Sequence, residues 1–295
     1  MNRRDFLTAA AGAAALSLAP RIGFGSRRPA LMKAVKFNMI EIDGSVRDKF
    51  EVLKELGFDG VEMHSPNDLT QEEVIEASRA VDLPIHGVVD MVHWDQTLSD
   101  PDPAVREAGV EGLRTALRDA EAYGASTVLL VPAVVTKEVS YDEAYQRSQA
   151  EIRKVLPEAQ SLGVRIALEN VWNEFLLSPL EFARYIDEFE SEWIGAYFDI
   201  GNVVTFGWPE HWIRILGPRI LKLDVKEYSN RVRDEEGMSA GFRVPLGEGD
   251  VDWPGVLDAL DEIGYSGWAT AEIPGGGRER MEEIAERMDE VLALP

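Results

Sequence analysis

Three observations predict that this chain folds as an α/β protein of the (β/α)8 TIM barrel class. Short apolar runs alternate with amphipathic stretches after residue 30, which is the pattern of βα units around a parallel sheet. Eight such apolar runs can be distinguished. Eight units in about 260 residues also match the usual size of the barrel. We therefore expect residues 31–295 to form a single domain, with its chemistry at the carboxyl ends of the strands.

The predicted strands are runs rich in Val, Ile, Leu and Ala that lie between turn signals. They cover residues 34–38, 60–63, 84–88, 127–131, 164–169, 195–199, 220–226 and 269–273. No linker, low-complexity tract or change of composition separates these runs. All eight are therefore expected in one sheet.

Capping residues mark where helices begin between the strands. Thr70 with Glu73 and Ser140 with Glu143 are spaced as capping boxes, in which the two side chains satisfy free backbone amides. A cap with an early proline marks three further starts, at Asp102, Ser178 and Asp252. Glycines follow the expected helix ends at positions 57, 124, 163 and 264. Helices therefore connect consecutive strands, as βα units require.

The longest stretch without a predicted element runs from residue 228 to residue 250, just after the seventh strand. It contains three arginines and the turn Leu246-Gly-Glu-Gly249. We expect an irregular loop here that could cover the rim of the barrel.

Residues 1–30 have the layout of a twin-arginine export signal. Arg3 and Arg4 precede Phe6 and Leu7, and a stretch made mostly of Ala, Gly, Leu and Ser follows. That stretch is too short and too weakly apolar for stable insertion in a membrane. We expect the twin-arginine export machinery to carry the folded protein to the periplasm. The alternative is a chance basic, amphipathic start.

Composition narrows the choice of partners and ligands. The formal net charge of −23 argues against nucleic acid or an anionic membrane as the main partner. The chain has no cysteine, which excludes disulfides and thiolate ligands. Oxygen and imidazole are therefore the strong metal ligands that remain. Composition leaves open whether the protein forms a homo-oligomer.

Carboxylates stand at the ends of four consecutive predicted strands. Glu169 ends the apolar run that begins near Arg165, and a carboxylate at the end of a buried strand needs a metal, a cation or a substrate. Pairing with an arginine is the alternative for one such residue alone. Asp199, Asp224 and Glu272 repeat the pattern on the next three strands. Four carboxylates at one rim would repel each other strongly unless a cation lay among them.

At these residues the chain resembles the sugar phosphate isomerase/epimerase superfamily. These xylose isomerase-like TIM barrels include ketose 3-epimerases, hydroxypyruvate isomerases, inosose dehydratases and DNA-repair enzymes of the endonuclease IV type. The matching stretches are Leu168-Glu169-Asn170, Phe198-Asp199-Ile-Gly-Asn202, the strand that includes Asp224, Leu246-Gly-Glu-Gly-Asp250-Val-Asp252-Trp253, and Glu272. They lie in the second half of the chain, whereas the first half matches only in its pattern of elements.

The resemblance implies one divalent cation held by Glu169, Asp199, position 224 and Glu272. Position 224 departs from the family, because the usual His-x-Lys reads here Asp224-Val-Lys226. An Asp can still be a ligand, and an all-carboxylate site favours Mn²⁺ or Mg²⁺, with Zn²⁺ or Co²⁺ as alternatives. The departure could also mean a weak site or none.

The resemblance also implies a reaction, the isomerisation or epimerisation of a keto-sugar or related polyol. A cation that chelates the carbonyl and a neighbouring hydroxyl makes the adjacent C–H more acidic and stabilises an enediolate. The family pattern assigns the proton transfers to Glu169 and Glu272, on opposite faces of the substrate.

Five further residues are predicted to contact the sugar. His64 and His86 follow or end strands and could face the rim, although structural histidines are the alternative. Trp172 could stack on a sugar face, or else pack in the core. Lys226 could bind substrate or neutralise the acids, and Asn170 completes the set. His93 and His211 are not assigned to the site.

Two other functions stay open. A lyase or dehydratase could expel water or an aglycone from a keto-sugar through the same enediolate. A non-catalytic sugar-binding or accessory barrel is the alternative from another class, because of Asp224. The DNA-repair branch is disfavoured, since it needs a histidine-rich zinc site and this acidic chain has four histidines, with Asn202 where that branch places one.

Overall fold

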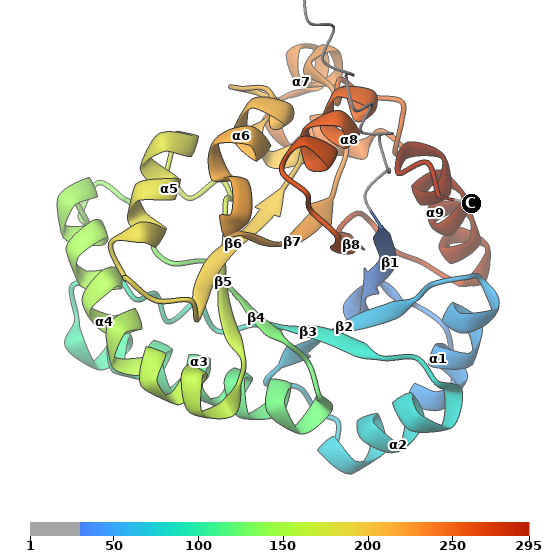
Figure 1. Cartoon of the computed structure of the whole chain (residues 1–295), viewed down its shortest axis with the longest axis horizontal. Helices are drawn as coiled ribbons and strands as arrows, with labels where there is room; N and C mark the ends of the chain where they lie inside the picture. Colours follow the sequence, from blue (N-terminus) through green and yellow to red (C-terminus); the bar gives the residue numbers. More distant parts are fainter. Residues whose placement is uncertain (1–29, 295) are drawn as a thin grey trace, which may run out of the picture.

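The computed structural model describes residues 30–294, which form a closed barrel of parallel strands ringed by helices (Figure 1). Each strand pairs with the next, and the last pairs with the first, so the strand order around the barrel is the order in the sequence. The strands are β1 (Leu31–Lys36), β2 (Gly60–Ser65), β3 (Ile85–Asp90), β4 (Thr127–Leu130), β5 (Arg165–Glu169), β6 (Ile194–Asp199), β7 (Ile220–Val225) and β8 (Gly267–Ala271). The predicted fold class is confirmed. The predicted export signal lies outside the described residues, apart from Ala30.

The first and last strands begin earlier than predicted, and the predicted ends at residues 38 and 273 are wrong. Leu31 pairs with Gly267 and Met32 with Trp268, a contact that exists only because the barrel closes. Lys33 interrupts the apolar pattern of β1, but its buried ammonium donates to Asp289 Oδ1 at 2.6 Å and to a backbone carbonyl. After Lys36 the chain turns into a short 3-10 helix, Phe37–Met39.

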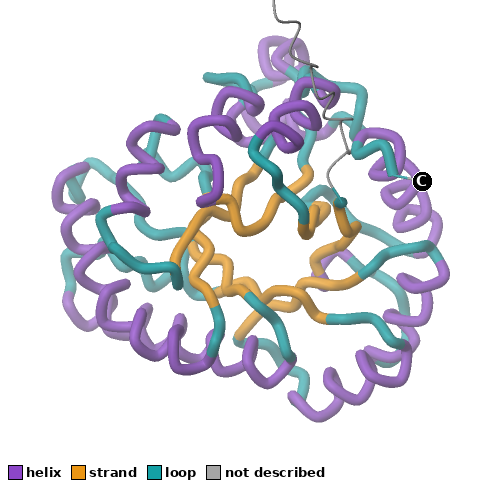
Figure 2. The backbone as a smooth tube through the Cα atoms, in the orientation of Figure 1, coloured by secondary structure: helices purple, strands orange, loops and turns teal. Residues whose placement is uncertain are grey.

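Helices follow the strands and form the outer layer, as the tube drawing shows (Figure 2). They are α1 (Val46–Glu55), α2 (Gln71–Val81), α3 (Pro103–Tyr123), α4 (Tyr141–Leu162), α5 (Pro179–Asp187), α6 (Pro209–Leu216), α8 (Trp253–Glu262) and α9 (Arg278–Val291). Side-chain caps are present at the five predicted helix starts, and Ser140 forms a full capping box. Among the described residues, no helix is long and apolar enough to cross a membrane.

The segment after β7 is helical, so the predicted irregular loop is wrong. It contains α7 (Asn230–Glu236) and a 3-10 helix (Met238–Arg243). The apolar periodicity that would have indicated α7 is missing, because Val232 is its only buried residue. Ser229 nevertheless caps the helix by accepting from the backbone N–H of Val232.

Glu227 anchors the base of this segment. Its buried carboxylate accepts hydrogen bonds from the backbone N–H groups of Tyr228, Gly247 and Val251 and from the indole N–H of Trp253, at 2.9–3.1 Å. Gly249 leaves room for it, since a Cβ there would lie 2.4 Å from Glu227 Oε1. The turn Leu246-Gly-Glu-Gly249 therefore folds around a fully satisfied carboxylate.

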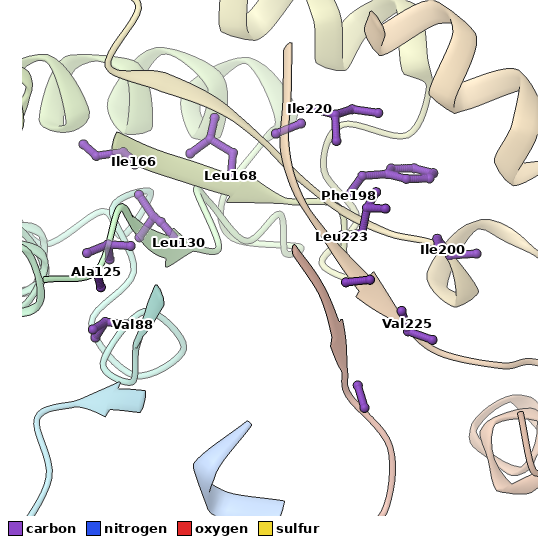
Figure 3. Packing of buried hydrophobic residues seen from close by; sticks show 14 of the residues in the cluster. Val88, Ala125, Leu130, Ile166, Leu168, Phe198, Ile200, Ile220, Leu223 and Val225 are labelled. Carbon is purple, nitrogen blue, oxygen red and sulfur yellow. The ribbon is translucent and has the colours of Figure 1, made fainter. Parts of the chain in front are cut away.

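Two different cores lie on the two sides of the strands. Apolar side chains on the outer side pack against the helices, and Figure 3 shows several of them, including Val88, Leu168 and Phe198. Inside the barrel the apolar cluster is small and centres on Leu129, Ala167 and Tyr197. The rest of the interior includes buried polar and charged side chains: Lys36, Glu62, His86, Lys222, Asp224 and Thr270. A polar interior of this kind is costly for folding, which points to a function.

Candidate active site

The four predicted acids meet at the carboxyl end of the barrel. Glu169 and Asp199 are the last residues of β5 and β6, Asp224 is the last but one of β7, and Glu272 follows β8 directly. One carboxylate oxygen from each lies within 4.8 Å of the others. Glu169, Asp199 and Asp224 are buried, whereas the Glu272 side chain is 33% exposed and faces the mouth. Parallel strands of matched length thus bring together residues that lie far apart in the sequence.

Two lysines enter this group of carboxylates, which we call the acid cluster. Lys226 Nζ lies 2.8 Å from Asp199 Oδ2 and 2.9 Å from Glu272 Oε2. Lys36 Nζ lies 3.0 Å from Asp224 Oδ2 and 3.4 Å from Glu272 Oε2. Glu272 is therefore held between two ammonium groups. Lys226 is one of the predicted site residues, whereas Lys36, the last residue of β1, is not.

Glu62 of β2 is a fifth acid beside the cluster. It is fully buried, and its Oε2 lies 3.9 Å from Lys36 Nζ. Gly87 on the neighbouring strand makes space for it, because a Cβ at that position would lie 2.6 Å from Glu62 Oε1. The sequence does show a glutamate inside the apolar run around Val61. It stands in the middle of the strand, however, so the pattern of a carboxylate at the end of a strand does not identify it.

Burial and neighbouring charges shift the pKa values of the four acids in different directions. Burial raises the pKa of Glu169 to about 8, and the charge of Glu272 adds to the rise. Burial also raises the pKa of Asp199 to about 6 and that of Asp224 well above its usual range. Burial alone would raise the pKa of Glu272 as well, but Lys226 and Lys36 hold it well below its usual range. With these side chains alone, Glu272 is ionised at neutral pH and Glu169 is mostly protonated.

The donor set fits a hard divalent cation. All four groups offer oxygen, the donor that Mg²⁺ and Mn²⁺ prefer. Asp224 Oδ1 is buried and has no hydrogen-bond partner within residues 30–294, while Oδ2 of the same carboxylate accepts from Lys36. An orphaned carboxylate oxygen inside a protein calls for a cation or a donor. The two lysines supply part of the positive charge that the acids need.

A cavity of about 170 Å³ opens above the acid cluster. Its polar lining includes Lys36, Glu62, Glu169, Glu272, His64 and His93. His64 stands near the end of β2, and its buried Nδ1 has no partner among the described residues. Its contact with a sugar stays a prediction. The sequence does not indicate a site role for His93, which follows a strand in an irregular segment. Burial lowers the pKa of His93 to about 3, so it is a neutral imidazole that accepts from the backbone N–H of Val131.

His86 does not lie at the rim. The prediction ended the third strand at residue 88, but β3 continues to Asp90, which puts His86 near the amino end of the strand. There Nδ1 contacts Lys222 Nζ at 2.8 Å, Nε2 contacts Thr270 Oγ1 at 3.1 Å, and the ring stacks on Trp268. His86 is thus a structural member of the barrel interior below the site.

Asn170 and Trp172 lie beside the cluster. The Asn170 amide donates to Asp199 O at 2.8 Å and accepts from Asp199 N at 2.9 Å, so it clamps β5 to β6 and fixes Asp199. The indole of Trp172 donates to Asn202 O at 2.8 Å and packs on Tyr228 and Phe242. Neither side chain lines the cavity above the acids. Their contact with a sugar stays a prediction.

Among curated proteins, the chain is 30% identical over 169 residues to the putative L-ribulose-5-phosphate 3-epimerase SgbU of Escherichia coli K12. That match covers 56% of this chain and 58% of SgbU. It is 25% identical over 265 residues to the L-ribulose-5-phosphate 3-epimerase UlaE of Escherichia coli O1:K1, with 83% of this chain and 88% of UlaE covered. The chain spans about three fifths of the first two curated relatives it matches, SgbU and a Methanocaldococcus jannaschii protein.

Solved structures share the fold. The Escherichia coli 3-keto-D-glucoside 4-epimerase YcjR aligns with a TM-score of 0.74 at 16% identity, covering 89% of this chain and 99% of that one. A D-tagatose 3-epimerase-like protein aligns with a TM-score of 0.75 at 21% identity, covering 89% and 97%. The sequence pattern of the xylose isomerase-like TIM barrel family matches residues 50–292, which include the four acids. The chain belongs to the xylose isomerase-like TIM barrel family.

Proposed function

We propose that this protein is a divalent-metal-dependent isomerase or epimerase that acts on a keto-sugar or a related polyol. The observation that carries the proposal is the pair of glutamates at one mouth, Glu169 on β5 and Glu272 after β8, within the reach of one small molecule. These two strands are three positions apart around the barrel, so the carboxylates approach a bound sugar from different sides. The sugar epimerases among the relatives support the same class of substrate.

Glu169, Asp199, Asp224 and Glu272 would hold the cation, with Mn²⁺ or Mg²⁺ favoured and Zn²⁺ or Co²⁺ as alternatives. When bound, such a cation would supply Lewis-acid chemistry that makes the C–H beside a carbonyl more acidic.

The side chains of the site divide the proton transfers between them. Glu272, which lies between two ammonium groups, takes the proton from the carbon beside the carbonyl, and the electron pair moves to the carbonyl oxygen as an enediolate forms. Glu169 then delivers a proton that it exchanges with solvent to the other face of the same carbon, which inverts that carbon. Delivery to the neighbouring carbon instead, with the hydroxyl proton passing to the former carbonyl oxygen, moves the carbonyl. Lys36 and Lys226 keep Glu272 ionised between turnovers.

The first test measures metal content and turnover together. Elemental analysis of the purified protein should find about one divalent ion per chain, and chelation should lower the melting temperature. The sugar panel takes its members from the relatives: D-allulose, D-tagatose, L-ribulose 5-phosphate and a 3-keto-D-glucoside. In D₂O the product should gain deuterium at the reacting carbon, because the proton exchanges with solvent on Glu169 or Glu272.

The same assay separates the alternatives. Loss of water or of an aglycone from the sugar would identify a lyase that uses the same residues. A protein that holds no metal, turns over no sugar and exchanges no proton with solvent would be an accessory barrel, and the proposed function would be wrong.

We also propose that the protein is exported in folded form to the periplasm by the twin-arginine route. The proposal is supported by Arg3 and Arg4 before a mildly apolar stretch. Replacing both arginines by lysine should leave the protein in the cytoplasmic fraction of a host that has this export system, measured by fractionation and immunoblot. Periplasmic recovery equal to that of the unaltered chain would contradict the proposal.

A further inference from the structure

A second cavity, which we call the apolar pocket, lies beside the acid cluster and is not used by the proposed proton transfers. Its volume is about 180 Å³, close to the roughly 150 Å³ that suffices elsewhere to bind benzene. Its apolar walls include Trp172, Leu176, Leu177, Phe206, Trp212 and Met238. These residues come from the segments that follow β5, β6 and β7, so the pocket opens at the same end of the barrel as the acids.

Three large apolar side chains at its edge are left in contact with solvent. Leu177, Phe206 and Met238 are 53%, 52% and 53% exposed, and each belongs to a different one of the three segments. A single exposed apolar residue is ordinary. Three that line one concavity form an exposed apolar patch, the kind of surface that marks an interaction site.

The backbone that builds this wall is strained. Glu174 and Leu176 have φ values of 58° and 53°, a left-handed conformation that costs free energy for residues with a side chain. The strained loop is held by the Asn173 amide, which donates to Ala133 O at 2.7 Å, and by Tyr141 Oη, which accepts from Leu176 N at 2.9 Å. Leu176 is thereby buried in the pocket wall while Leu177 stays at its edge. Strain of this kind is often found at binding sites, and here the two hydrogen bonds keep it in place.

The apolar pocket adjoins the acid cluster. Val171 lines both this pocket and the cavity above the acids. Asn202 lines the pocket, and its amide lies 3.5 Å from Glu169 Oε1 and 3.5 Å from Lys226 Nζ. Val171 and Asn202 thus lie between the two spaces, which are close enough for the two halves of one ligand.

We propose that the apolar pocket binds an apolar, ring-sized group carried by the sugar substrate. The substrate class is then a glycoside with an aromatic or similar apolar aglycone, not a free monosaccharide. This inference rests on the proposed function for the sugar half of the ligand, whereas the pocket itself is argued from its own walls. A concave space of this volume suits a small ring better than the flat surface of a second protein chain.

The test begins with 4-fluorophenol, a probe that needs no sugar chemistry. Its ¹⁹F line should broaden and shift on addition of the purified protein, and its affinity should fall at least about fivefold in Phe206→Ala and in Leu177→Ser. Leu180→Ser is the matched control, because Leu180 is 71% exposed and lies outside the pocket. No binding, or equal binding by all variants, would overturn the proposal.

Matched phenyl and methyl glycosides of the sugar accepted in the turnover panel complete the test. The KM of the phenyl glycoside should be at least about tenfold lower than that of the methyl glycoside. In Phe206→Ala the KM of the phenyl glycoside should rise to that of the methyl glycoside, and the KM of the methyl glycoside should stay the same. Equal KM values with normal turnover would contradict the aglycone site but agree with the proposed function. Probe binding without turnover of any sugar would agree with an apolar binding site but contradict the proposed function. A dimer in sedimentation velocity that Phe206→Ala dissociates would show a subunit interface instead, and would also overturn the proposal.

Discussion

Replacing Glu169 by glutamine is expected to reduce turnover about 1,000-fold while the barrel stays folded. Glutamine has nearly the same shape, but it can neither donate the acidic proton nor ligate a cation as strongly, and general acid–base groups contribute about 10²–10⁴-fold. Glu272→Gln should have an effect of the same size, because it removes the ionised partner held by Lys36 and Lys226. The measurement is kcat on the best sugar of the panel, with circular dichroism as the check on folding.

The matched control is Glu192→Gln, an exposed glutamate in the turn before β6. It should leave kcat unchanged. The double variant Glu169→Gln/Glu272→Gln should be little worse than either single change, since the two groups act as a unit. Turnover within tenfold of the unaltered protein in either single variant would show that the assigned glutamate does not transfer the proton.

Replacing Lys36 by methionine is expected to destabilise the protein by about 3–5 kcal/mol. Asp224 is fully buried, and Lys36 Nζ, at 3.0 Å, is its ion-pair partner. Removal of one partner from a buried ion pair leaves an uncompensated charge, which costs about that much. The free energy of unfolding is measured by urea denaturation in the presence of a chelator, so that no metal contributes to it.

A double-mutant cycle separates the ion pair from simple packing. Lys36→Met combined with Asp224→Asn should recover about 1–3 kcal/mol relative to the sum of the single changes, because position 224 then carries no unpaired charge. Lys54→Met is the control, since the Lys54 side chain is 46% exposed and should cost less than about 1 kcal/mol. Additive single effects would mean that Lys36 and Asp224 do not depend on each other.

The sequence was sufficient to predict the four acids of the site, but not the lysine Lys36 that neutralises them. Glu169, Asp199, Asp224 and Glu272 could be predicted to meet, because parallel strands of similar length end at one rim. The position of Lys36 beside the acids could not be predicted, because a lysine at the end of the first strand faces them only once β1 pairs with β8. Local patterns contain no information about that closure, and the early start of β1 was missed for the same reason.

The histidines show how much a strand boundary matters. Two additional residues at the end of β3 were enough to move His86 from the rim to the barrel interior, beside Lys222 and Thr270. His93 lines the cavity although it follows the strand in an irregular segment. Strand ends are the least certain part of any sequence prediction, and site residues near them inherit that uncertainty.

The carboxylate of Glu227 also bears on how specificity can change in this protein. It ties both ends of the segment between Tyr228 and Gly247 to a point directly after β7. The segment between those ties, which includes α7 and Met238 of the apolar pocket, leaves and rejoins the barrel at this one carboxylate. Arg233, which donates to Thr205 Oγ1, and Phe242, which packs on Trp172, add contacts with the neighbouring segments. Substitutions in this segment away from those contacts are therefore expected to change the wall of the apolar pocket while the four acids keep their places.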